Sequence, residues 1–291
     1  MKNPVPRVAA IHDLSGFGRS SLTVVIPVLA TMGAQVCPLP TAVLSTHTSE
    51  FKNYSMLDLT GYMADYIRHW ESLHLEFDAI YSGFLGSSKQ VEIVASFIDK
   101  FSKKDQLIVV DPVLGDDGEP YGPIGNDLIE GMRALIGHAD IITPNFTEAA
   151  FLLNYSYDKE IREGKIKEWI RELSDKGPRI VIMTSVPVEE AQKITSVIAY
   201  NRNDARFWRV NCNFIPAFYP GTGDIFTSVI VGSILQGDSL PIALDRAVQF
   251  VSIAIRASFG YDLPKRDGVL LERVLDNLRA PIVSSTYEIL E

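Results

Sequence analysis

The sequence predicts an α/β fold of three layers, in which helices cover both faces of a central and mostly parallel sheet. Short runs that are apolar along their whole length recur in the chain and alternate with longer amphipathic segments. Such runs are typical of strands buried on both faces, and intervening helices are the usual connections of parallel strands. A segment with two β-rich runs around a polar turn adds an antiparallel hairpin at one edge.

The elements are expected in the following order. The first strand covers Val8–Ile11, and a turn with Gly16 and Gly18 leads into a helix over Ser20–Met32. The hairpin covers Ile194–Val210, with its turn at residues 201–204. The other expected strands are Phe77–Tyr81, Leu107–Val110, Ala139–Ile142 and Ile180–Met183, and the other helices include Gln90–Phe101, Lys165–Leu173, Asp224–Leu235 and Leu240–Ser258.

No repeat, low-complexity tract or linker divides the 291 residues, so one domain over 1–291 is expected. A hydrophobic fraction of 46% and a charged fraction of 22% are typical of globular proteins. The net charge of −9 argues against nucleic acid as a partner and favours a small molecule. Cys37 and Cys212 are too few for a disulfide framework, which favours a cytoplasmic setting.

Residues 20–46 carry no charge and could be mistaken for a membrane span. Pro27, Gly33, Pro38 and Pro40 interrupt this segment, which favours a buried helix followed by a strand. No apolar core of a signal peptide precedes Asp13, so neither secretion nor membrane insertion is expected.

The turn after the first strand, GFGRSS over 16–21, nearly matches the dinucleotide-binding fingerprint. Ser21 replaces its third glycine, and no acidic residue between Leu14 and Ser49 could bind a ribose. A nicotinamide enzyme is therefore disfavoured. The Walker A motif is also absent, so ATP chemistry would need another phosphate-binding loop.

The segment YPGTGDIF, residues 219–226, can form such a loop. Gly221 and Gly223 allow backbone N–H groups around Thr222 to converge at the start of the following helix, where an anion would be stabilised. Asp224 could then accept a proton from an attacking hydroxyl group. The alternative is that Asp224 only caps the helix, and the motif alone leaves both open.

Three further loops carry polar residues at expected strand ends. DPVLGDDG begins at Asp111 and could hold hydrated magnesium, or be a solvated turn. In TPNFTE, residues 143–148, Glu148 is also suited to stabilising a helix start. Thr184 and Ser185 end another strand with hydroxyl groups that could contact phosphate. Because ligands bind at the carboxyl ends of parallel strands, these loops are expected to form one site.

Together with STHT at 45–48 and SGFLGS at 82–87, these motifs resemble the pyridoxal kinases of the ribokinase-like superfamily. The resemblance runs from about Val8 to the final helices. It implies a ribokinase-like three-layer fold and transfer of the ATP γ-phosphate to the 5′-hydroxymethyl group of pyridoxal, pyridoxine or pyridoxamine. It also implies magnesium, a monovalent cation such as K⁺, and a homodimer.

The resemblance also implies roles for individual residues. Asp224 matches the catalytic base, and residues 221–223 match the anion hole. Asp111 and Glu148 match positions associated with magnesium. The remaining matches are to ATP-binding positions, namely Asn145, Thr184, Ser185 and a cover over ATP that includes Asp117 and Tyr121, and to vitamer-binding positions, namely Asp13, Ser15, His47, Thr48 and Phe84.

The first loop departs from the family pattern, because Asp13 stands where many pyridoxal kinases have serine. Its DLSG sequence is similar to the hydroxymethylpyrimidine kinases of thiamine synthesis. A carboxylate could pair with a protonated pyridine nitrogen or accept from a pyrimidine amino group. The alternatives are thus a hydroxymethylpyrimidine kinase, or a protein that binds pyridoxal phosphate with little turnover.

Overall fold

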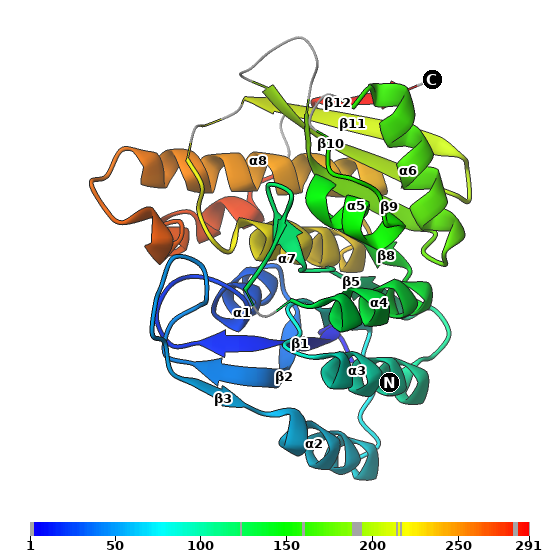
Figure 1. Cartoon of the computed structure of the whole chain (residues 1–291), viewed down its shortest axis with the longest axis vertical. Coiled ribbons are helices and arrows are strands. Elements are labelled where there is room, and N and C mark those ends of the chain that lie inside the picture. The colour runs from blue at the N-terminus through cyan, green and yellow to red at the C-terminus, as the bar shows by residue number, and fades with distance from the viewer. Residues whose placement is uncertain are drawn as a thin grey trace.

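The computed structural model describes residues 3–122, 124–158, 161–187, 194–213, 215, 217–281 and 285–290. Within these ranges a ten-stranded sheet runs through the molecule in the order β12-β11-β10-β9-β8-β5-β4-β1-β2-β3 (Figure 1). The predicted α/β class with a mostly parallel sheet and an antiparallel hairpin is confirmed.

Parallel strands form the centre of the sheet, and antiparallel strands form its two ends. The parallel strands are β1 (Arg7–Ser15), β2 (Gln35–Leu44), β4 (Ala79–Ser82), β5 (Leu107–Val110), β8 (Ile141–Ile142) and β9 (Ile180–Pro187). The antiparallel strands are β3 (Met56–Asp58), β10 (Ile194–Asn201), β11 (Arg206–Asn213) and β12 (Tyr287–Leu290). The predicted hairpin is β10–β11, but β12 pairs with β11 and occupies the outermost position.

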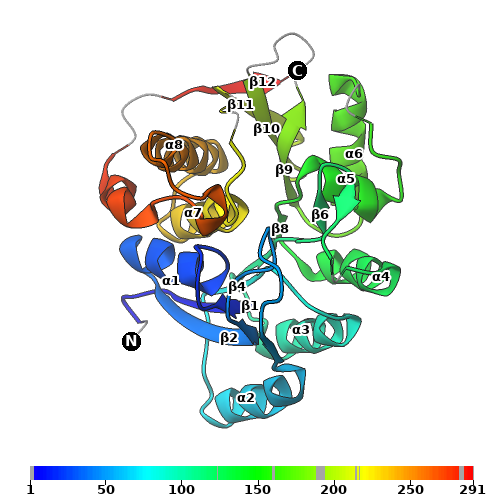
Figure 2. The ribbon, with the colours of Figure 1, turned by 60° about the vertical axis from the view of Figure 1, so that its left-hand side comes forward.

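The helices lie in two layers on opposite faces of the sheet (Figure 2). One layer contains α1 (Leu22–Thr31), α7 (Thr222–Leu235) and α8 (Leu240–Phe259), with the short turns η2 (Lys265–Asp267), η3 (Leu271–Arg273) and η4 (Leu275–Arg279) nearby. The other contains α2 (Thr60–Ser72), α3 (Ser88–Phe101), α4 (Asn126–Leu135), α5 (Phe146–Leu153) and α6 (Glu163–Asp175), with η1 (Ile136–His138).

Strand β1 shows why both faces are apolar. Val8 and Ala10 pack in the core under α1, α7 and α8, whereas Ala9 and Ile11 pack in the core under the other layer. All four side chains are fully buried, as the alternation of side chains along a strand requires when helices cover both faces. The same alternation directs His12 toward the α7 layer.

The expected elements agree with the observed ones to within a few residues, except at three strands. Strand β9 continues to Pro187, four residues beyond its predicted end at Met183. Strand β1 continues to Ser15, four residues beyond its apolar run, because its backbone goes on pairing with β2 up to Leu44; the polar side chains of His12 and Ser15 are buried there. Strand β8 has only two residues. In the part of the chain that the structure describes, no helix has the length and apolar character that crossing a membrane requires.

Candidate active site

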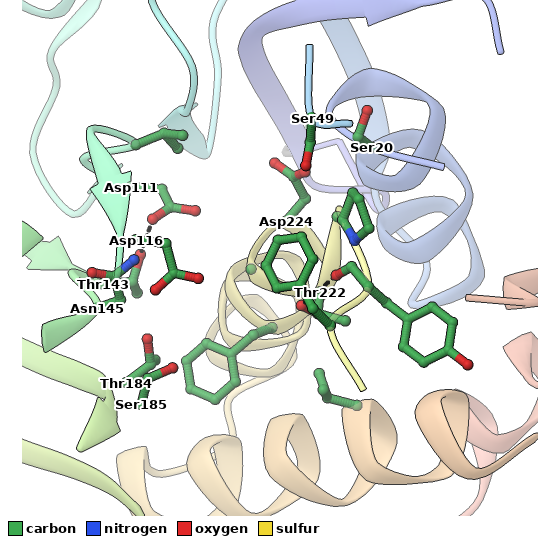
Figure 3. Close-up of a pocket in the computed structure, with 18 of the residues that line it drawn as sticks. Ser20, Ser49, Asp111, Asp116, Thr143, Asn145, Thr184, Ser185, Thr222 and Asp224 are labelled. Carbon is green, nitrogen blue, oxygen red and sulfur yellow. Dashed lines mark hydrogen bonds between the residues drawn. The ribbon is translucent and has the colours of Figure 1, made fainter. Parts of the chain in front are cut away.

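A cavity of about 940 Å³ lies at the carboxyl ends of the parallel strands, next to the start of α7. Its walls come from the loops after β1, β2, β4, β5 and β8, from strands β9 and β10, and from helices α7 and α8. In Figure 3, Asp111, Asp116, Thr143 and Asn145 lie on one side of the cavity and Asp224 and Thr222 on the other. This volume is large enough for small organic molecules.

The start of α7 depends on a glycine at position 221. Gly221 has φ +80°, and a Cβ atom there would lie 2.1 Å from the carbonyl oxygen of Arg19. No side chain caps this helix among the described residues, so the N–H groups of its first turn are available to an anion in the cavity. Gly223 also lines the cavity, but its Cβ position is open and its backbone is not strained.

Asp224 lies in the first turn of α7 and faces the cavity. Its Oδ2 atom accepts a hydrogen bond of 2.8 Å from the backbone N–H of Ser21, which belongs to the loop before α1. The helix-capping alternative is therefore wrong, since the N-cap residue is Gly221 and the carboxylate accepts from a different segment. Burial raises the pKa of Asp224 to about 8, and the nearby charges of Asp111 and Asp13 add to the effect.

Asp13 lies at the end of β1 and is 5% exposed. It accepts hydrogen bonds from Ser15 Oγ at 3.0 Å and from Ser21 Oγ at 2.5 Å. Burial raises its pKa although these hydrogen bonds act against the shift. Ser15, which the sequence predicts to contact the vitamer, is fully buried behind Asp13 and is not among the described residues lining the cavity. Its role in the structure is to hold the carboxylate.

Asp111 follows β5 and is held by two threonines. Thr143 Oγ donates to its Oδ1 at 3.0 Å, and the hydroxyl of Thr227 lies 3.3 Å from its Oδ2 and 3.0 Å from the Thr143 hydroxyl. Burial raises the pKa of Asp111 to about 7 despite both hydroxyl groups. Helix α7 thus contacts the predicted metal loop through Thr227.

Glu148 and Asn145 form a capping box at the start of α5. Asn145 Oδ1 accepts from the Glu148 N–H at 2.8 Å, and Glu148 Oε2 accepts from the Asn145 N–H at 2.7 Å. Glu148 Oε1 also accepts from the Leu114 N–H at 3.1 Å. Burial, with the charge of Asp111, raises the pKa of Glu148 well above its usual range. Glu148 therefore stabilises the start of helix α5, which is the alternative role that its sequence position predicts.

The predicted magnesium ligands form an oxygen-only set of two buried carboxylates, and both have raised pKa values that a nearby cation would lower. Across the described ranges, no group of three or more His, Cys, Asp or Glu residues is placed to hold a metal ion. Two carboxylates fit magnesium, because this ion usually keeps several waters and binds phosphate oxygens in addition. The donor set therefore fits the predicted ion.

The other predicted site residues lie where the sequence motifs place them, along the cavity wall. They are His47, Thr48, Phe84, Asp117, Tyr121, Thr184, Ser185 and Thr222. His47 also contacts the C-terminal part of the chain, since its Nε2 lies 2.6 Å from the carbonyl oxygen of Arg266. Asp117 follows a small hairpin strand, β6 (Gly115–Asp116), which pairs with β7 (Glu119–Pro120) at the predicted cover.

Sequence reasoning missed two groups of residues around the cavity. Ser20 and Ser21 line it, whereas the sequence pattern marks Ser21 only as the residue that breaks a dinucleotide fingerprint. An apolar section is lined by Cys212, Phe226, Val248, Val251 and Ile255. The apolar pattern of the last helices was visible in the sequence, but it does not distinguish residues facing a cavity from residues facing the core.

The sequence model of the phosphomethylpyrimidine kinase family matches residues 21–266. The chain belongs to this family. Membership, together with the pyridoxal kinases among the similar proteins, confirms the predictions of an enzyme, of a kinase and of a relative of the pyridoxal kinases in the ribokinase-like superfamily. Proteins with solved structures also resemble this chain over nearly its whole length.

A candidate phosphomethylpyrimidine kinase of Bacteroides thetaiotaomicron, crystallised with pyridoxal, is 55% identical and has a TM-score of 0.96, with 98% of this chain and 100% of that chain covered. The pyridoxal kinase of Lactobacillus plantarum is 29% identical, with a TM-score of 0.86 and coverage of 95% and 97%. The pyridoxal kinase of Arabidopsis thaliana is 26% identical over 96% of this chain and 85% of its own length.

Proposed function

We propose that the chain transfers the γ-phosphoryl group of ATP to the 5′-hydroxymethyl group of a vitamin B6 vitamer, which is pyridoxal, pyridoxine or pyridoxamine. The observation that carries this proposal is a partly buried carboxylate, Asp224, in the first turn of α7, a helix that has no side-chain cap among the described residues and that begins at a cavity of small-molecule size. The relative crystallised with pyridoxal, at 55% identity, supports the choice of vitamer.

In this mechanism Asp224 accepts the proton of the vitamer hydroxyl as its oxygen attacks the γ-phosphorus. The new oxygen–phosphorus bond forms while the bond to the β-phosphate oxygen breaks, and ADP leaves. The N–H groups of residues 221–223 stabilise the charge on the transferred phosphoryl oxygens. Asp111 and Glu148 would hold magnesium, which supplies positive charge next to the phosphates.

The vitamer ring is proposed to lie near the loops after β1, β2 and β4. Phe84 offers an aromatic surface for stacking, and Asp13 offers a buried carboxylate to the pyridine nitrogen. ATP is proposed to extend from the start of α7 past Asn145, Thr184 and Ser185, under the hairpin with Asp117 and Tyr121. Its base would reach the apolar section lined by Val248, Val251 and Ile255.

A hydroxymethylpyrimidine kinase is the second candidate. Asp13 favours it, because a carboxylate can accept from a pyrimidine amino group as well as pair with a pyridine nitrogen. The name of the matching family points in the same direction. A protein that binds pyridoxal phosphate with little turnover is the third alternative, and the retained Asp224 and Asp111 argue against it.

The test is ADP release by the purified protein with MgATP and each candidate substrate separately: pyridoxal, pyridoxine, pyridoxamine and hydroxymethylpyrimidine. Turnover on a vitamer that falls by at least about 1,000-fold in Asp224→Asn supports the proposal. Turnover on the pyrimidine alone would assign the second candidate. Tight binding of pyridoxal phosphate without ADP release would assign the third.

The homodimer and the monovalent cation remain proposals from family resemblance. Light scattering at assay concentration tests the first, and comparison of KCl with tetramethylammonium chloride at equal ionic strength tests the second. We also propose a single domain over 1–291. The cavity residues come from elements of one sheet and of the two cores that lie on its faces.

A further inference from the structure

His12 is a fully buried histidine next to the proposed catalytic base. It lies on β1 and shares a face of the sheet with Val8 and Ala10, which is the face covered by α1 and α7. The ring is 0% exposed and is not among the described residues that line the cavity. It therefore lies behind the cavity wall, where substrates do not reach.

Both ring nitrogens of His12 lack a hydrogen-bond partner within the described residues. Burial lowers the pKa of His12 to about 3, so the ring is neutral and carries one N–H donor and one acceptor. Buried polar atoms are nearly always paired in folded proteins, and an unpaired one calls for an explanation. A leucine would fill this space without that cost.

The position of the ring is specific. Its Nδ1 lies 3.9 Å from Asp224 Oδ1, and the ring packs edge-on against Tyr81 with centroids 4.4 Å apart. Gly83 makes room for it, since a Cβ atom at residue 83 would lie 2.3 Å from Nδ1. The other carboxylate oxygen, Oδ2, already accepts from the Ser21 N–H.

We propose that His12 is a positioning residue for Asp224, donating from Nδ1–H to Oδ1 when the acceptor hydroxyl of the substrate is bound. The inference depends on Asp224 being the base in the proposed function. Closing the distance by about 1 Å would make a normal hydrogen bond. Each carboxylate oxygen then accepts one N–H, which fixes the carboxylate plane and leaves a lone pair directed at the substrate.

Among the described residues, Asp111 and Asp13 disfavour the ionised form of Asp224, and the Ser21 N–H favours it. The other titratable groups nearby are the neutral side chains of His12, Tyr81 and Tyr121. A donor at Nδ1 of His12 also favours the ionised form of Asp224, as the Ser21 N–H does. Removing that donor should therefore make Asp224 harder to ionise and move the acid limb of kcat/KM to higher pH.

Three substitutions at His12 distinguish the effect of its N–H donor from the effect of its side-chain volume. His12→Leu keeps an apolar side chain of similar size without a donor. His12→Asn places an amide nitrogen near the position of Nδ1, whereas His12→Gln places one near Nε2, away from Asp224. His69→Leu, at an exposed position on α2, is the control for loss of a histidine.

We expect His12→Leu and His12→Gln to lower kcat by about 10- to 100-fold with KM changed less than about threefold. The acid limb of the kcat/KM profile should move up by about one pH unit. His12→Asn should restore kcat to within about threefold of the wild-type value. Wild-type kcat and an unshifted profile in His12→Leu, with a normal melting temperature, would overturn the proposal, as would equal impairment of the Asn and Leu variants.

A second measurement does not depend on turnover. In protein labelled with ¹⁵N-histidine and saturated with pyridoxal at pH 9, above the pKa of about 8 of Asp224, the His12 resonance should report the Nδ1–H tautomer. It should shift in Asp224→Asn, whereas the His69 resonance should not. The Nε2–H tautomer would overturn the positioning role. If Asp224→Asn retains turnover, the base assignment fails instead, and the tautomer result still stands on its own.

Discussion

The backbone N–H of Ser21 donates to Asp224 Oδ2 over 2.8 Å, joining residues that are 203 positions apart in the chain. The side chain of the same serine donates to Asp13 Oδ1. Ser21 also adopts φ 50°, in the left-handed region that non-glycine residues rarely occupy. One residue in a strained conformation therefore links the proposed base to the proposed ring-binding carboxylate, as strained residues often do at functional sites.

Ser21→Ala removes the hydrogen bond to Asp13 but keeps the N–H that reaches Asp224. We expect the KM for pyridoxal to rise about 10-fold, because a buried hydrogen bond to a carboxylate contributes on the order of 1.5–3 kcal/mol. The value of kcat should stay within about threefold. Steady-state kinetics at saturating MgATP measures both, and Ser15→Ala, which removes the longer bond to Asp13, should have a smaller effect. A fall in kcat at unchanged KM would contradict the conclusion that the Ser21 side chain acts on substrate binding through Asp13.

The two glycines of the α7 loop should respond differently to alanine. Gly221→Ala combines a left-handed φ with a clash against the Arg19 backbone, so it should destabilise the fold by about 1–3 kcal/mol and abolish turnover. Gly223→Ala meets no atom within 4 Å and should keep its melting temperature. Its methyl group would instead hinder approach of phosphate to the backbone, raising the KM for ATP. Equal melting temperatures for the two variants would contradict the conclusion that the fold requires glycine at 221 but not at 223.

Thr227→Val keeps the side-chain shape but removes the hydroxyl between Asp111 and Thr143. The loss should lower the free energy of unfolding by about 1–2 kcal/mol, as for other buried hydrogen bonds. The magnesium concentration for half-maximal activity should also rise, because Asp111 loses a group that orients it. The matched control is Ser233→Ala on the same helix, whose buried Oγ has no partner in the described structure. An unchanged magnesium requirement would contradict the proposal that Asp111 binds magnesium.

Ionisation of Asp224 should lower the free energy of unfolding at high pH. Its pKa is about 8 when folded and 3.8 when unfolded, so the folded state holds the proton more tightly. The resulting stabilisation is complete below pH 3.8 and is lost as pH rises through 8. Asn does not ionise, so Asp224→Asn should exceed the wild type in stability by on the order of 6 kcal/mol at pH 9 and by about 2 kcal/mol at pH 5.

Urea unfolding at pH 5, 7 and 9 measures this difference, with Asp105→Asn on an exposed loop as the control. A gap between Asp224→Asn and the wild type that does not change with pH would contradict the raised pKa. The result also bears on function, because a base whose ionisation costs stability is expected where the substrate and cation supply the compensating interactions.

Much of the site could be predicted from the chain because its motifs occupy the ends of apolar strands. Parallel strands place their carboxyl ends on one edge, so Asp111, Asn145 and Thr184 had to lie near one another once the sheet was inferred. Ser15 shows the limit of this argument. Ser15 is fully buried and donates to Asp13, which itself lines the cavity. A motif match cannot distinguish a residue that contacts substrate from one that supports its neighbour.

The sequence by itself determined the α/β class, the strand-end loops and the chemical types of the side chains on them, because hydrophobic period and turn residues are local properties. Only the tertiary structure decided that Ser21 contacts Asp224, that His12 lies behind it and that α8 lines the cavity. These contacts depend on strand order and helix packing, which bring distant segments together by burying surface on both faces of one sheet.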